Sequence, residues 1–192
     1  GILPGATVLG WSLGAMVALT LARRHPDRVE RLILVSATPR FTQTDGWDCG
    51  ISDSVFGVFA RFLLEDYRQT LNRFLSLQVR GGTASRDTLR RLRALLYARG
   101  EPVPEALAGG LEILRCADLR PWLGEIEQPA QVIAGLRDRL VPAEASRRLA
   151  AALPNARFDG LEDAGHAPFI SHRETFLAAL AAGRAALTGA GA

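Results

Sequence analysis

Apolar and polar positions alternate with two different periods along this chain. An apolar run at residues 6–9 is followed by a helical apolar pattern from Leu13 and by a second apolar run at 31–36. A strand, a helix and a strand in this order predict parallel strands joined by a helical crossover. The same alternation resumes after about residue 119. The elements predicted there are strands at 130–135 and near 156–160, and helices at 143–152 and 173–187.

The middle of the chain lacks this alternation. Between about residues 41 and 118, apolar side chains recur at helical spacing, as at Val55, Phe56 and Phe59. Such spacing predicts an all-helical insertion of about four helices. We therefore expect an α/β fold with a mostly parallel sheet flanked by helices. Its parts are a first core part (1–40), a helical lid (41–118) and a second core part (119–192).

A serine stands on the turn between the first strand and the first helix, in Gly10-Trp11-Ser12-Leu13-Gly14. A serine between glycines on a strand-to-helix turn is typical of the nucleophile elbow of serine hydrolases. We expect a strained backbone at Ser12, and glycines at 10 and 14 because β-carbons there would clash as strand and helix approach. The backbone amide of Leu13 is expected to be one oxyanion-hole donor.

A serine nucleophile needs a base, and the chain has three histidines. His166 lies on a predicted loop between a glycine and a proline, a usual place for a base held by a rigid scaffold. The alternative is an ordinary surface-loop histidine. His25 is expected to end a helix before Pro26, and His172 to belong to the entry of the last helix.

The acid that orients the base is expected between the serine and the histidine in the sequence. Asp138 follows the strand at 130–135, where ligand crevices form in open parallel sheets. Asp163 competes for this role, but it is three residues from His166 and is expected to shape that loop. Alternatively, Asp138 belongs to a solvated surface cluster with its arginine neighbours.

These residue types predict acyl transfer through a covalent intermediate. Ser12 would attack an acyl carbon, His166 would take its proton, and Asp138 would hold the imidazole and stabilise the imidazolium. This chemistry needs no metal and no organic cofactor.

Composition narrows the functional class further. The net charge of +3 does not require a nucleic-acid partner, and no apolar run approaches the about 20 residues of a membrane span. Cys49 and Cys116 fit no metal-site spacing and are expected to be free thiols in a reducing cytoplasm. The chain begins at Gly1 without a methionine, and a second oxyanion donor is expected from an upstream segment of about 60–80 residues with a His-Gly-Trp-like turn.

Four segments of the chain together resemble one family, the pimeloyl-[acyl-carrier protein] methyl ester esterases of biotin synthesis, which are α/β-hydrolases. The segments are Gly10–Gly14, Arg73–Gln78, Gly109–Leu114 and His166–His172. The elbow is shared by many hydrolases, whereas the lid motifs and His-Ala-Pro-Phe-Ile-Ser-His are much more specific. The resemblance implies a carboxylesterase that removes the methyl group from a pimeloyl chain on acyl carrier protein.

The resemblance also assigns roles to individual residues. The family's nucleophile, acid and base match Ser12, Asp138 and His166. Its substrate contacts correspond to Trp11, Leu13 and Phe74, and its lid arginines that face the acidic carrier protein correspond to Arg73, Arg86 and Arg90. One family arginine is replaced here by Gln69.

Other interpretations of the sequence stay open. The chain could be a hydrolase for small esters or lactones that shares only ancestry with that family, or an inactive, truncated hydrolase fragment. The lid arginines could serve only to keep the lid soluble. We expect a monomer.

Overall fold

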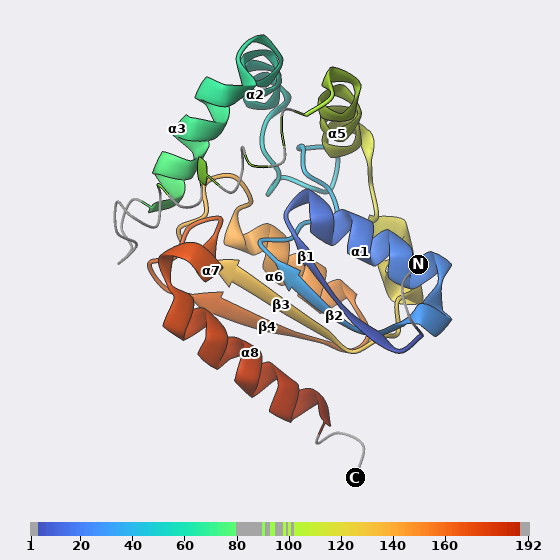
Figure 1. Ribbon diagram of the computed structural model, residues 1–192. Coiled ribbons are helices and arrows are strands. Elements are labelled where there is room, and N and C mark those ends of the chain that lie inside the picture. Colours follow the sequence, from blue (N-terminus) through green and yellow to red (C-terminus); the bar gives the residue numbers. More distant parts are fainter. Residues whose placement is uncertain are drawn as a thin grey trace.

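A four-stranded parallel sheet forms the centre of the protein, shown by a computed structural model that describes residues 4–79, 90, 93, 94, 98, 100 and 102–188. Each strand pairs with the next in the order β1-β2-β3-β4, so the predicted parallel alternation is confirmed (Figure 1). The strands are β1 (Ala6–Trp11), β2 (Val29–Val35), β3 (Ala130–Gly135) and β4 (Ala156–Leu161).

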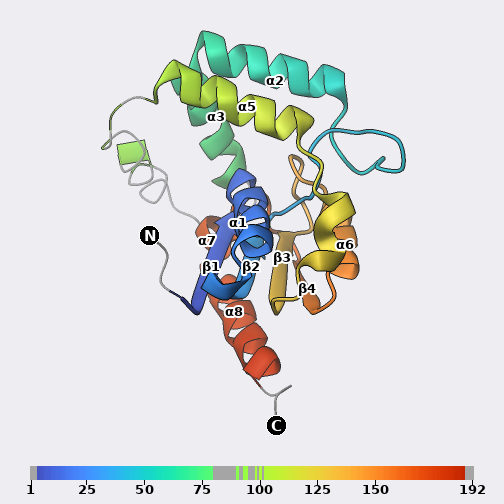
Figure 2. The same ribbon diagram turned by 90° about the vertical axis from the view of Figure 1, so that its right-hand side faces the viewer.

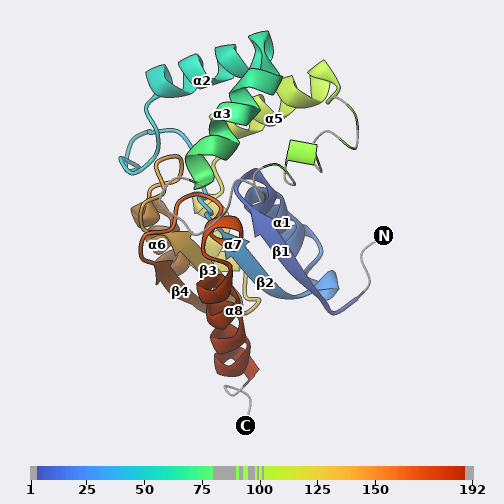
Figure 3. The ribbon, with the colours of Figure 1, turned by 60° about the vertical axis from the view of Figure 1, so that its left-hand side comes forward.

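Helices cover both faces of the sheet because successive side chains of a strand point to opposite sides. On β2, Leu32 and Leu34 pack on one face in a cluster with α1, α6 and η2, while Val35 packs on the other face in a cluster with Phe176 of α8. Figure 3 shows α8 across the sheet from α6. These elements are α1 (Leu13–Arg24), η1 (Pro26–Arg28), η2 (Arg120–Glu125), α6 (Ala143–Ala152), α7 (Pro168–Ser171) and α8 (Arg173–Thr188).

Three helices of the predicted lid that the structure describes lie beyond the carboxyl ends of the strands, and we call them the lid helices (Figures 1 and 2). They are α2 (Asp53–Glu65), α3 (Tyr67–Val79) and α5 (Pro104–Cys116), and α2 packs against both of the others. Buried Phe56 of α2 and Leu111 of α5 share an apolar cluster with Val141 beside α6, which joins the lid helices to the core. The remainder of the expected helical insertion falls largely on residues 80–101, which lie mostly outside the described part of the chain.

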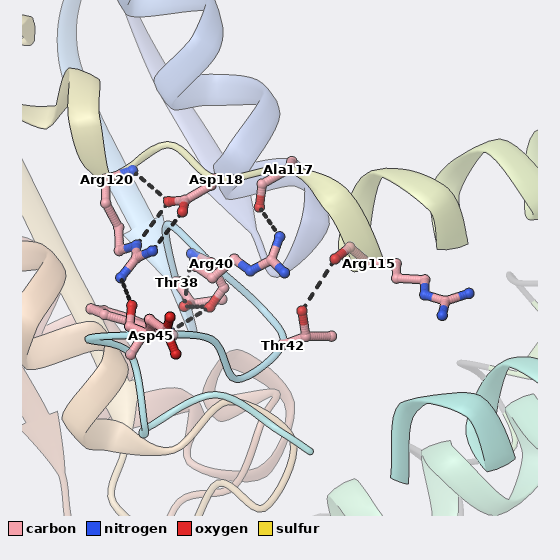
Figure 4. A network of polar contacts seen from close by, with 9 residues as sticks. Thr38, Arg40, Thr42, Asp45, Arg115, Ala117, Asp118 and Arg120 are labelled. Carbon is pink, nitrogen blue, oxygen red and sulfur yellow. Dashed lines mark hydrogen bonds and ion pairs between the residues drawn. The ribbon is translucent and has the colours of Figure 1, made fainter. Parts of the chain in front are cut away.

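The two segments that lead into and out of the lid helices lie antiparallel beside each other and are joined by polar contacts (Figure 4). Arg40 and Asp118 form an antiparallel bridge, and Thr42 donates its hydroxyl hydrogen to the carbonyl of Arg115 at 3.1 Å. The Arg120 guanidinium donates two hydrogen bonds to the Asp118 carboxylate, at 2.9 and 2.6 Å, and the Arg120 amide donates a third at 3.1 Å. We call Arg40, Thr42, Asp118 and Arg120 the lid-base residues. Hydrogen bonds from Arg120 lower the pKa of Asp118 below its usual value.

Two further sequence predictions can be compared with the structure. Cys49 and Cys116 are both free, as expected. Among the residues that the structure describes, no helix is both long enough and apolar enough to cross a membrane.

Candidate active site

Ser12 occupies a sharp turn between the last residue of β1 and the first residue of α1. Its backbone has φ 55° and ψ −121°, in the region with positive φ that L-residues rarely adopt. Its amide donates to the carbonyl of Val35 on β2 at 3.0 Å, and its carbonyl accepts from Ala15 at 2.9 Å. The surrounding sheet and helix thus hold a conformation that costs about 1–3 kcal/mol. The strain predicted for this serine is confirmed.

The two glycines of the elbow differ in their structural role. A β-carbon on Gly10 would lie 2.5 Å from the carbonyl oxygen of Gly14, so only glycine fits where the strand meets the helix. A β-carbon on Gly14 would have no described atom within 4 Å apart from its own helix turn. The expectation of a clash at Gly14 is therefore wrong, because its side-chain direction points into open space instead of toward β1.

His166 and Asp138 form a buried pair at the carboxyl end of the sheet. The imidazole Nδ1 lies 2.7 Å from the carboxylate Oδ2, and the side chains are 2% and 0% exposed. The other carboxylate oxygen accepts hydrogen bonds from the amides of Leu140 and Val141 at 2.8 and 2.9 Å. A carboxylate only accepts hydrogen bonds, so the hydrogen of this contact belongs to Nδ1; in a neutral imidazole, Nε2 then holds the lone pair of a base.

Asp163, the competing acid, does not contact the imidazole. It forms an ion pair with Arg137 and has φ 60°, so it shapes the turn before His166 as expected. Because Arg137 pairs with Asp163, Asp138 is not part of a solvated cluster with that arginine.

A close backbone approach brings the acid loop and the histidine loop together. A β-carbon on Gly135, the last residue of β3, would lie 2.2 Å from the carbonyl oxygen of Gly165. Just beyond it, the amide of Arg137 donates to the carbonyl of Ala164 at 2.9 Å. The absence of a side chain at Gly135 therefore sets the spacing that lets Asp138 reach His166. A glycine at a strand end is the sequence signal that could have indicated this approach.

Trp11 joins the elbow to the histidine loop. Its indole N–H donates to the backbone carbonyl of His166 at 2.8 Å, and the two ring centroids are 5.4 Å apart. The same indole makes an edge-on contact with Phe169, with centroids 5.2 Å apart. Trp11 immediately precedes Ser12, so this contact places the serine turn beside the histidine loop, while Nε2 of His166 has no hydrogen-bond partner within the described part of the chain. The sequence analysis did not anticipate this anchor.

The other residues with expected roles lie on or near the lid helices. Leu13 opens α1, and its side chain reaches α5, where a β-carbon on Gly110 would lie 3.5 Å from it. Arg73 is exposed on α3, and Arg90 is exposed in a helical turn. Phe74 belongs to α3, but its side chain is outside the described part, as is the whole of Arg86.

His25 and His172 stand where the sequence placed them. His25 ends α1 and donates its amide hydrogen to the carbonyl of Leu21 at 2.8 Å. His172 separates α7 from α8, and its carbonyl accepts from the amide of Phe176.

This arrangement suits acyl transfer by a serine. An imidazole oriented by a buried carboxylate can accept a proton, and the first backbone amides of a helix, which lack partners within the helix, can stabilise a negative charge. The site lies at the carboxyl ends of β1, β3 and β4, below the lid helices (Figure 3).

Comparisons with known proteins agree with this geometry. Residues 3–173 match the family model described as alpha/beta hydrolase fold. A pimeloyl-[acyl-carrier protein] methyl ester esterase of Nitrosomonas europaea is 43% identical over 176 residues, which are 91% of this chain and 70% of that protein. The protein of the same name from Xanthomonas oryzae pv. oryzae is 44% identical over 177 residues, 92% of this chain and 70% of that protein. An esterase structure from Exiguobacterium antarcticum has a TM-score of 0.84 at 25% identity, and covers 94% of this chain and 66% of that one.

Proposed function

Because this chain belongs to the α/β-hydrolase family, and within it to the pimeloyl-[acyl-carrier protein] methyl ester esterases, we propose that it hydrolyses the methyl ester of a pimeloyl chain carried on acyl carrier protein. The observation that carries this proposal is the buried His166–Asp138 pair, which Trp11 joins to the serine elbow. The product carboxylate would then be available for biotin synthesis.

The residues divide the reaction into two steps. The Ser12 hydroxyl attacks the ester carbon while Nε2 of His166 takes its proton, and the C–O bond to the methoxy group then breaks. His166 returns the proton to the departing methanol. Water next attacks the acyl-enzyme, again losing a proton to His166, and the serine leaves with that proton. Asp138 stabilises the imidazolium formed in each step.

The carbonyl oxygen of the ester becomes negatively charged in the transition state, and hydrogen-bond donors must stabilise that charge. In this proposal the backbone amide of Leu13, at the start of α1, donates one hydrogen bond to the oxyanion. A donor of this kind contributes about 3 kcal/mol of transition-state stabilisation.

The lid arginines are proposed to receive the carrier protein. Acyl carrier proteins are acidic, and a guanidinium binds carboxylates with two parallel hydrogen bonds. Arg73 and Arg90 are exposed, which supports an encounter role for them together with Arg86. Complementary charge would speed association and orient the tethered chain. We place the enzyme in the cytoplasm as a monomer, and the free Cys49 and Cys116 fit a reducing compartment.

Turnover of purified full-length protein tests the proposal. Pimeloyl methyl ester on its carrier should be converted to the acid with release of methanol, and far faster than a short p-nitrophenyl ester or a lactone. Ser12→Ala should abolish both turnover and labelling by a fluorophosphonate, and Asp138→Asn should reduce kcat about 10⁴-fold. Equal activity on carrier-bound and short esters would favour a general esterase. Absence of fluorophosphonate labelling would exclude a serine hydrolase.

A further inference from the structure

A groove of about 730 Å³ runs along α3, and its described lining does not include Ser12. Its described lining comes from three successive turns of α3 and from Arg93 farther along the chain. The polar side chains that the argument uses are Asp66, Arg68, Asn72, Arg73, Ser76 and Arg93.

The charge of this lining favours an anion. Three of its members are arginines and one is an aspartate. The aspartate is already engaged, because an Asp66 carboxylate oxygen accepts a hydrogen bond from the amide of Gln69 at 2.9 Å in the first turn of α3. Three guanidinium groups outnumber one carboxylate, so positive charge dominates the groove, and guanidinium groups bind phosphate and carboxylate oxygens in preference to neutral ligands.

Arg93 is fixed in the wall of the groove. Its Nη2 donates to the hydroxyl of Ser76 at 3.1 Å, and this hydroxyl donates in turn to the carbonyl of Asn72 at 2.7 Å. The Nε–H of Arg93 is buried and has no hydrogen-bond partner within the described part of the chain. Because solvent does not reach this Nε–H, a ligand in the groove would be bound by the terminal Nη nitrogens of Arg93.

Arg73 supplies a second cation to the same groove. It is exposed, and its guanidinium has no ion pair or hydrogen bond among the residues that the structure describes. Arg73 and Ser76 are three residues apart on a helix, so they lie on the same face of α3. The groove thus combines one fixed and one adaptable guanidinium.

The position of the groove relates it to the candidate active site. From Asp66 to Ser76, α3 rises about 15 Å. The helix packs against α7, which begins two residues after His166, and Figure 3 shows its carboxyl-terminal end beside α7. The groove therefore leads from the outer lid toward the histidine loop, along the direction in which a tethered chain would enter.

We propose that this groove binds the phosphodiester through which an acyl carrier protein holds its flexible acyl arm. The proposal rests on the proposed function and adds a site for the arm beside the arginines that receive the carrier, with Arg73 belonging to both. Arg93 and Arg73 hold the phosphate oxygens, and Ser76 keeps the Arg93 guanidinium in place. Binding the phosphate here fixes the depth to which the arm can enter.

Two small ligands test this site. Calorimetry of the full-length protein should show 4′-phosphopantetheine binding at least tenfold more tightly than pantetheine, which lacks the phosphate. Arg93→Met should remove this difference, and Ser76→Ala should reduce it. The matched control is Arg61→Met on α2, where the exposed arginine lies 4.0 Å from Glu65 and outside the groove lining; it should leave the difference unchanged. Equal binding of the two ligands by the unaltered protein would overturn the proposal.

Turnover separates this inference from the proposed function. The pimeloyl methyl ester is offered on pantetheine, on phosphopantetheine and on the intact carrier protein. Arg93→Met should lower kcat/KM about tenfold for the two phosphate-containing substrates and leave the pantetheine substrate unaffected. A loss confined to the intact carrier would show that Arg93 binds carrier carboxylates, which contradicts a phosphate site. Failure to hydrolyse all three substrates would refute the esterase function, while calorimetry would still decide the phosphate site.

Discussion

Ser12 shows how single residues carry conflicting demands. Its positive φ suits glycine, yet the proposed chemistry needs a hydroxyl at this point. The motif Gly10-Trp11-Ser12-Leu13-Gly14 was enough to predict the strain, because a strand-to-helix turn this tight has few solutions. It was not enough to predict the open space at Gly14, which depends on the angle at which α1 leaves the strand.

Comparing Ser12→Gly with Ser12→Ala isolates the strain. Both variants lack the hydroxyl, but alanine keeps the β-carbon that resists φ 55°. We expect the glycine variant to be more stable by about 1 kcal/mol, against the usual effect of glycine on the unfolded chain. Urea unfolding at pH 7 measures the difference. An alanine variant equal to or more stable than the glycine variant would show that the turn holds no strain.

Trp11 offers a second test at the residue scale. Trp11→Phe keeps an aromatic ring but removes the N–H that bonds the His166 carbonyl. We expect kcat to fall about tenfold with KM little changed, because the lost hydrogen bond positions the base and does not bind substrate. The control is Trp122→Phe on η2, where the indole stacks with Arg23 of α1. This variant should leave kcat unchanged. A change in unfolding free energy alone would reduce Trp11 to a packing role.

At the scale of elements, the apolar pattern was a reliable guide where packing repeats. It placed β3 and α6 at the bounds observed, since continuous apolar runs and helical spacing follow from burial. It could not indicate that buried Gln131 on β3 bonds Asp159 at 2.7 Å and the carbonyl of Ala179 at 2.8 Å. That contact ties α8 to the sheet and depends on partners 28 and 48 residues away.

The acid and histidine loops were found from residue type and chain order, but their close approach was not. Gly135→Ala would place a β-carbon 2.2 Å from the Gly165 carbonyl oxygen, where backbone and not a flexible side chain must move. We expect a loss of about 3 kcal/mol in unfolding free energy and a large fall in kcat as Asp138 and His166 separate. Gly57→Ala, in open space on α2, should be neutral or stabilising by up to about 1 kcal/mol. Thermal unfolding and ester turnover of both variants test this, and unchanged turnover for Gly135→Ala would contradict it.

At the scale of the whole molecule, the lid-base residues connect the two segments that lead into and out of the lid helices. Asp118→Asn keeps the shape but removes the charge that pairs with Arg120. We expect the variant to be less stable by about 1–2 kcal/mol at pH 7, because the pair is partly buried and makes two hydrogen bonds. Asp48→Asn, whose side chain is 84% exposed in its ion pair with Arg148, should cost much less.

The pH dependence of that difference follows from the lowered pKa of Asp118. A carboxyl group with a lower pKa in the folded state stabilises the fold fully above its unfolded value, near 3.8. That stabilisation is lost as pH falls through the folded pKa. The gap between the unaltered protein and Asp118→Asn should therefore be constant from pH 7 to 5 and shrink below about pH 4. A gap that widens on acidification would contradict the ion pair.

The bridge between Arg40 and Asp118 also brings the two ends of the inserted segment together. Residues facing each other in an antiparallel bridge are only about 5 Å apart, close enough for a two-residue turn to connect them. Recombination at these two positions would replace the segment between them with one of another length and leave the sheet unchanged. A new segment at this place would change which esters fit the site, without moving the proposed serine, acid and base.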